Sequence, residues 1–148
     1  LAKERGADHL INYTDEDLRK VVRGITDGNG VDVVYDPVGG DLADAAMRSM
    51  AWSGRFLVVG FASGKVPQFP GNYLLVKNIA IVGVYWGAYR TKEPDTFRAS
   101  FEELGEWWRA GKLKPHISRV LPLRDVPKAL AMLEGRKATG RLVIDIDA

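Results

Sequence analysis

The sequence contains no cysteine, which excludes disulfide bonds and thiolate metal sites within this chain. Its longest apolar runs are far too short to span a membrane, so we expect no membrane partner. Charges of both signs are interspersed, with a net charge of +2 and no long basic run, which argues against a nucleic-acid partner. The sequence has 46% hydrophobic and 27% charged residues over 148 positions, which is typical of a soluble globular protein with one cored domain. We expect a cytoplasmic location.

Neither common glycine-rich phosphate-binding motif, G-x-G-x-x-G or G-x-x-x-x-G-K-S/T, occurs in the sequence. Gly28 and Gly30 precede a predicted strand instead of following one, and the pair at 39–40 lacks the spacing. The two histidines, His9 and His116, show no metal-ligand spacing, and no serine lies in a nucleophile elbow. We therefore expect no catalytic residue, no metal site and no complete phosphate cradle in this chain.

Apolar strands alternate with amphipathic helices, which predicts an α/β fold with a parallel sheet covered on both faces. A helix beginning at Thr14 is indicated by apolar residues at the i, i+3, i+4 and i+7 positions, and a second helix is expected to begin at Asp41. The first of these presents Leu18, Val21, Val22 and Ile25 inward, and the second Leu42, Ala46 and Met50. Strands are expected at residues 9–13, 31–35, 55–60 and 79–86.

The pattern changes after residue 94. We expect a helix over 95–110, a strand at 117–123, a short helix at 126–133 and a final strand at 141–146. The long helix is expected to turn Phe97, Phe101, Leu104 and Trp108 inward. We accordingly place a partial domain at residues 1–94 and a separate carboxyl-terminal segment at 95–148. The sequence begins without Met on what looks like a helix end closed by Gly6, so we expect the native protein to be longer.

The turns that follow three of the predicted strands are the candidate ligand contacts, because ligands of open parallel sheets bind outside the carboxyl ends of the strands. These turns lie at residues 36–40, 60–64 and 84–87, and each contains glycine. Glycine lets a flat ring or another backbone approach closely, but it is also ordinary in turns. From spacing alone, both a ligand contact and a plain turn stay open for each segment.

Eight short segments occur in an order that resembles the carboxyl-terminal half of the medium-chain dehydrogenase/reductase superfamily, in its zinc-independent NADPH:quinone oxidoreductase branch. No single segment is specific, but the ordered set is. The resemblance implies a partial Rossmann-like, doubly wound parallel sheet made of strands 3–6, with the phosphate loop and most of a catalytic domain before Leu1. The segments are residues 6–9 (GADH), 11–13 (INY), 30–40 (GVDVVYDPVGG), 54–64, 74–78 (LLVKN), 83–89, 111–113 (GKL) and 137–140 (KATG).

The resemblance also implies a function: transfer of a hydride from NADPH to a small-molecule quinone or enone. One of the implied cofactor contacts, Lys137 at a cofactor phosphate, is equally well explained as an ordinary surface lysine. The residues implied to contact the cofactor are Tyr13 near the adenosine phosphate, Pro37 and Val38 beside the adenosine half, Gly60, Phe61, Ala62, Ser63 and Gly64 on the loop towards nicotinamide, Val84, Tyr85 and Trp86 beside the carboxamide, and Lys137 at a cofactor phosphate.

The strand at 79–86 would form the sheet edge, and by resemblance it pairs with its own copy in a homodimer. Its apolar run suits a paired edge better than a free one. Without family strands 1 and 2 the sheet would have a gap between strands 3 and 4. Two other readings stay open: a non-catalytic nucleotide half-site or oligomerisation module, and an enoyl reductase or zinc-dependent alcohol dehydrogenase whose zinc ligands would lie upstream.

Overall fold

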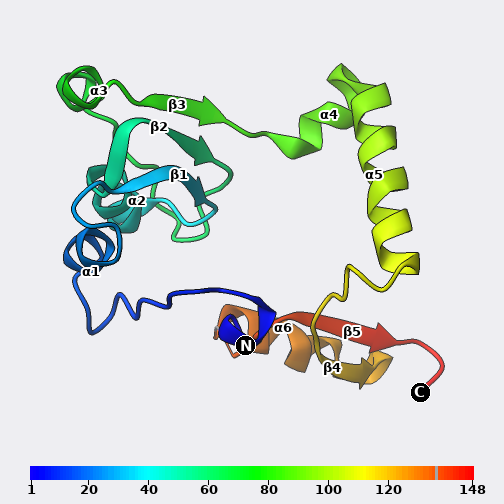
Figure 1. The fold of residues 1–148 in the computed structure, drawn as a ribbon. Coiled ribbons are helices and arrows are strands. Elements are labelled where there is room, and N and C mark those ends of the chain that lie inside the picture. Colours follow the sequence, from blue (N-terminus) through cyan, green and yellow to red (C-terminus); the bar gives the residue numbers. More distant parts are fainter. Residues whose placement is uncertain (136) are drawn as a thin grey trace. The chain divides into compact units, whose positions relative to one another are not determined.

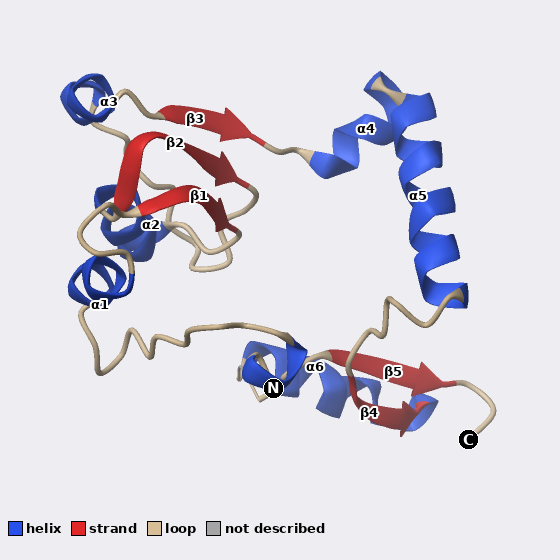
Figure 2. Ribbon diagram, in the orientation of Figure 1, coloured by secondary structure: helices blue, strands red, loops and turns tan. Residues whose placement is uncertain are grey.

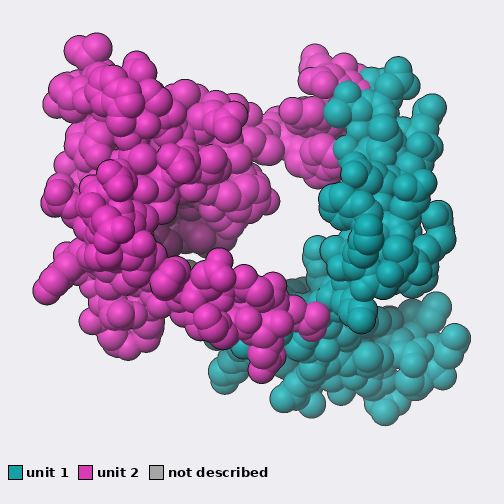
Figure 3. Space-filling view, in the orientation of Figure 1, with its two compact units in different colours: residues 1, 94–148 teal, residues 2–93 magenta. Residues whose placement is uncertain are grey.

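A computed structural model describes residues 1–135 and 137–148 and divides the chain into two compact units (Figures 1 and 3). The amino-terminal unit comprises residues 2–93. The carboxyl-terminal unit comprises residues 94–148 together with Leu1. Each unit has its own sheet and is described by itself; their assignment to the domains of a longer protein stays a prediction.

The sheet of the amino-terminal unit is parallel and three-stranded, with the order β1-β2-β3 (Figure 2). This arrangement confirms the predicted α/β fold class. After a short 3-10 turn at Lys3–Arg5, the elements are α1 (Leu18–Ile25), β1 (Val31–Asp36), α2 (Gly40–Arg48), β2 (Met50–Val58), α3 (Gly71–Lys77), β3 (Ala80–Gly83) and α4 (Trp86–Lys92).

The core lies on one face of this sheet, where α2 packs on β1 and β2, and α3 packs on β2. Phe56 is fully buried at its centre and meets the ring of Phe69 edge-on, with the ring centroids 5.1 Å apart. The opposite face leaves Val33, Tyr35 and Val82 exposed. The expected cover on both faces is therefore not met within this unit, because its described helices that pack on the sheet gather on the core side. The other buried apolar residues of the cluster are Ala43, Met47, Met50 and Ile79.

Helix α1 begins later than expected. The side chain of Asp17 accepts a hydrogen bond from the Lys20 N–H at 3.0 Å, which caps the first turn of the helix. Thr14 instead donates its hydroxyl to the Asn12 side chain at 2.7 Å within a preceding turn, so the prediction that Thr14 is the cap is wrong. Met50, expected on the second helix, is buried as the first residue of β2.

The strand predicted at residues 9–13 is not formed; residues 9–12 have no regular structure, and a turn begins at Tyr13. A strand needs a neighbour for its backbone hydrogen bonds. The neighbour implied for this segment is a family strand expected to precede Leu1, so local preference alone does not form it. The predicted gap in the sheet does not arise either, because the three described strands are adjacent.

The last predicted strand of this unit is shorter than the predicted 79–86. Strand β3 ends at Gly83, the Val84 N–H donates to the Val58 carbonyl at 2.8 Å, and α4 begins at Trp86. Its neighbour β2 also ends at Val58, so the ladder has no partner beyond this point. Strand β3 consequently ends three residues earlier than the sequence indicated.

The carboxyl-terminal unit contains a parallel β4-β5 pair with a small core at Leu121 and Ala129. The prediction for helix α5 is right in position and wrong in burial, since Phe101 and Trp108 are 53% and 65% exposed. Their apolar face has no covering element among the described residues of this unit. The elements are α5 (Pro94–Arg109), β4 (Ile117–Pro122), a 3-10 turn (Leu123–Asp125), α6 (Val126–Glu134) and β5 (Arg141–Asp145).

Candidate functional site

The turn after β1 is organised by one buried carboxylate. Asp36 is 6% exposed, and its Oδ1 accepts hydrogen bonds from the N–H groups of Val38 at 2.8 Å and Gly39 at 3.0 Å. Bonds from backbone N–H groups to an ionised acceptor are among the stronger kinds in proteins. Asp36 therefore fixes the path of the chain where it leaves the sheet.

The loop after β2 is held against this turn by backbone hydrogen bonds. The N–H groups of Ala62 and Ser63 donate to the carbonyls of Pro37 at 3.0 Å and Val38 at 2.9 Å, and the Gly40 N–H donates to the Lys65 carbonyl at 3.0 Å. The approach is close enough to require glycine at position 39, where φ is +72° and a Cβ would lie 2.8 Å from the Lys65 carbonyl oxygen. Residues 36–40 and 59–65 thus form one joined structure.

The ends of β2 and β3 enclose a hollow of about 200 Å³ beside this structure. Its walls are mostly apolar, which favours a flat, weakly polar group over a phosphate. The residues that line it are Val58, Val59, Gly60, Phe61, Gly83, Val84 and Tyr85.

A nicotinamide ring fits the chemistry of this hollow. No atom lies within 4 Å of the place where a Cβ of Gly83 would stand, so that part of the wall is open to a ring. Among the described residues the Phe61 N–H makes no backbone hydrogen bond and can serve a carboxamide oxygen. The residues that line the hollow place no charged side chain in it.

The structure brings together most, but not all, of the residues predicted for cofactor contact. Tyr13 is 59% exposed on the loop before α1, and Trp86 packs on Tyr89 at 5.2 Å between ring centroids instead of lining the hollow. Lys137 is exposed in the other unit. Those gathered at the carboxyl ends of the strands are Pro37, Val38, Gly60, Phe61, Ala62, Ser63, Gly64, Val84 and Tyr85.

Sequence reasoning included Asp36 only as part of the candidate turn at 36–40, without a role for its side chain, and it missed Val58, Val59 and Gly83. Asp36 carried a usable signal, because a single acid that ends an apolar strand just before proline is well placed to accept N–H groups of the following turn. The lining role of the other three depends on where β2 and β3 stop pairing. That is a tertiary property, and local sequence does not encode it.

No metal site is formed by the residues that the structure describes: no group of three or more His, Cys, Asp or Glu side chains there could hold an ion. The groups that bind Zn²⁺ in proteins do not converge in this part of the molecule. Over the same residues, no helix is long and apolar enough to cross a membrane.

A parallel sheet whose strand ends join in a glycine-rich structure around an apolar hollow is characteristic of the dinucleotide-binding class of α/β domains. The family model described as zinc-binding dehydrogenase matches residues 5–144, and the chain belongs to that family. It corresponds to the carboxyl-terminal half of medium-chain dehydrogenases/reductases, as the ordered segments had indicated.

Similar proteins carry quinone oxidoreductase names. A quinone oxidoreductase-like protein 2 homolog of Nematostella vectensis is 42% identical over 146 residues, which cover 98% of this chain and 40% of that protein. The quinone oxidoreductase of Pseudomonas syringae is 31% identical with a TM-score of 0.82, over 97% of this chain and 44% of that one. The Escherichia coli quinone oxidoreductase, solved in complex with NADPH, is 28% identical with a TM-score of 0.84 and the same coverage.

The chain thus spans about two-fifths of the length of the curated relatives it matches. The relatives named here are quinone oxidoreductases or quinone oxidoreductase-like proteins.

Proposed function

We propose that the protein to which this chain belongs reduces a quinone or enone with a hydride from NADPH. The observation that carries the proposal is the apolar hollow at the ends of β2 and β3, bordered by a turn and a loop that are joined through backbone hydrogen bonds. Similarity to quinone oxidoreductases, one of them solved with NADPH, supports the choice of cofactor and substrate class.

In this proposal the bound nicotinamide supplies the hydride, and this chain supplies its surroundings. The side chains of Val58, Val59 and Phe61 keep water from one face of the ring. Asp36 holds the first turn, so that the loop joined to it keeps its position at the hollow. No side chain here is proposed to move a proton, which leaves protonation of the product to solvent or to residues outside this chain.

The remaining cofactor contacts are proposed with the same function. Pro37 and Val38 border the adenosine half, while Tyr13 and Lys137 serve cofactor phosphates and Trp86 lies near the carboxamide. NADPH rather than NADH is proposed from the relatives, and a cytoplasmic location stays a prediction.

The open edge of β3 supports a homodimer in this proposal. β2 pairs with one side of β3, and no described strand pairs with the other side; Val82, on the uncovered face of the sheet at this edge, is 40% exposed. A second copy of β3 would satisfy the free backbone groups and cover the apolar edge. We expect sedimentation equilibrium of the intact protein to give twice the monomer mass, and Val82→Lys to shift it to the monomer; a monomeric parent protein would contradict the dimer.

The test of activity is NADPH oxidation by quinones, followed at 340 nm, combined with Gly83→Val. Because no atom lies near a Cβ at this position, the variant should fold normally but place a branched side chain at the hollow. We expect the KM for NADPH to rise at least tenfold, with the melting temperature within about 2 °C of the parent.

Ala80→Val is the matched control, since Ala80 lies on the same strand, is exposed and does not line the hollow. It should leave the KM for NADPH within twofold of the parent. If none of the quinones and enones tested supports NADPH oxidation by the intact protein, the proposed reaction is wrong. If Gly83→Val and Ala80→Val act alike on KM, the hollow is not where the cofactor ring binds.

A further inference from the structure

A second pocket lies at the opposite, amino ends of the strands in the amino-terminal unit. Its volume is about 160 Å³, and Gly30, Ser49 and Met50 form its floor where β1 and β2 begin. Four basic side chains from three helices also line it. This basic pocket is defined by Arg19, Arg23, Arg48 and Lys77, together with Tyr73 and the turn at 28–30.

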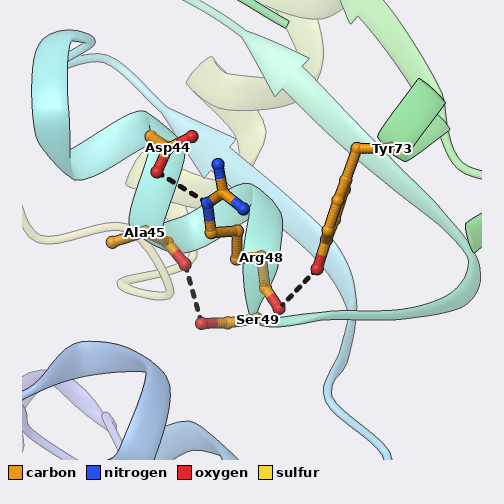
Figure 4. Close-up of polar contacts among 5 residues, drawn as sticks. All are labelled: Asp44, Ala45, Arg48, Ser49 and Tyr73. Atoms are coloured by element: carbon orange, nitrogen blue, oxygen red, sulfur yellow. Dashed lines mark hydrogen bonds and ion pairs between the residues drawn. The ribbon is translucent and has the colours of Figure 1, made fainter. Parts of the chain in front are cut away.

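Two of the four cations are fixed in place. The Arg48 Nε donates to the Asp44 carboxylate at 2.8 Å, and its guanidinium lies 5.4 Å from the centre of the Tyr73 ring (Figure 4). The Tyr73 hydroxyl donates to the Arg48 carbonyl at 3.2 Å, which ties α3 to the end of α2. Lys77 Nζ donates to the Met50 carbonyl at 2.7 Å. Asp44 raises the pKa of Arg48 through this hydrogen bond and its charge, so Arg48 stays cationic.

Helix dipoles account for only part of this charge. Arg23, Arg48 and Lys77 stand in the last turns of α1, α2 and α3, where cations offset roughly half a negative charge per helix end. Asp17 also borders a neighbouring hollow with Arg19 and Arg23. Even with Asp44 and Asp17 both included, the four cations slightly exceed what the three helix ends and two carboxylates neutralise. The pocket therefore keeps a positive charge.

Arg19 and Arg23 carry this excess. They are four residues apart on α1, so their side chains share one helix face, and like charges at this spacing are unfavourable by a few tenths of a kcal/mol. Neither forms an ion pair or side-chain hydrogen bond with any residue that the structure describes. The donors of both guanidiniums are therefore available to a bound anion.

We propose that the basic pocket binds a small dianionic oxyanion, with a phosphate monoester as the favoured class. Two unpaired guanidiniums present planar donor pairs that match phosphate oxygens, and Lys77 adds a point charge. The volume admits a phosphate with a few attached atoms and is too small for a dinucleotide. Because the pocket lies at the other end of the strands from the hollow, its ligand would not compete with the nicotinamide cofactor.

The test is a titration of the intact protein with inorganic phosphate, followed by ¹H–¹⁵N NMR of arginine Nε–H groups and backbone amides. We expect saturable shifts at Arg19, Arg23 and residues 28–30, which sodium chloride of equal ionic strength does not reproduce. Arg19→Gln combined with Arg23→Gln should weaken phosphate binding at least tenfold. Both positions are exposed on a helix, so the double variant should keep its fold.

Arg119→Gln with Arg124→Gln is the charge-matched control, since both residues are exposed in the carboxyl-terminal unit. It should change the phosphate affinity less than twofold. A parallel titration with malonate separates a phosphate site from a general dianion site: weaker binding of malonate supports the phosphate assignment, and equal or tighter binding overturns it. Shifts that do not saturate, or equal losses in both double variants, would overturn the pocket itself.

Discussion

Gly30→Ala is expected to be among the most destabilising single substitutions in this chain. Gly30 has φ of +88°, and a Cβ there would lie 2.5 Å from the Ser49 carbonyl oxygen and 2.8 Å from the Ala51 nitrogen. Both contacts are with backbone, which cannot turn away. Left-handed strain of about 1–2 kcal/mol and overpacking of about 1–3 kcal/mol together predict a loss of about 2–5 kcal/mol in the free energy of unfolding.

Gly28→Ala is the control that separates strain from contact. Gly28 has a similar φ of +84°, but nothing lies within 4 Å of its Cβ position. Only the strain of about 1–2 kcal/mol should remain. Urea unfolding of both variants measures the difference, and equal losses would show that α2 and the start of β1 are not in close contact at Gly30.

Phe56→Ala is the second substitution with a large expected effect. The Phe56 side chain is fully buried between the sheet and α2 and packs edge-on against Phe69. Truncating a phenylalanine in such a core costs about 3–5 kcal/mol, from lost burial and the cavity left behind. The free energy of unfolding from chemical denaturation should fall by that amount.

Phe101→Ala serves as the comparison, because Phe101 is 53% exposed on α5. The expected loss is about 0.5 kcal/mol, as for surface positions in general. If Phe101→Ala lowers the free energy of unfolding as much as Phe56→Ala does, the apolar face of α5 is buried against another element. The two substitutions remove the same atoms, so only burial separates them.

Sequence patterns predicted correctly the elements that an apolar run or an amphipathic face marks locally, and they were wrong where strand pairing or burial depends on another element. The strand at β1 and the helix at α6 were placed within a residue or two, because an apolar run or an amphipathic face marked them. Residues 9–13 have a strand-like composition but pair with no strand among the residues that the structure describes, so propensity alone did not form a strand. The apolar stripe of α5 likewise predicted burial, but no described element of its unit covers that stripe, and its side chains are exposed.

In the candidate site, too, the features with a local sequence signal were predicted and those that depend on distant contacts were not. The three turns could be located because strand ends and glycines are local signals. The hydrogen bonds from Ala62 and Ser63 to the turn after β1 join residues about 25 positions apart, and no short-range pattern reports them. The basic pocket was missed altogether, since Arg19, Arg48 and Lys77 come from three helices and read individually as surface charge.

The backbone bonds between the loop after β2 and the turn after β1 bear on which residues can be exchanged there. Each bond joins an N–H to a carbonyl, so almost any amino acid at positions 62 and 63 supplies it, and only proline lacks the donor. The side chains at positions 62 and 63 can therefore vary while the loop keeps its course. Substitutions at these two positions could change what the loop contacts during evolution without changing the conformation of the loop.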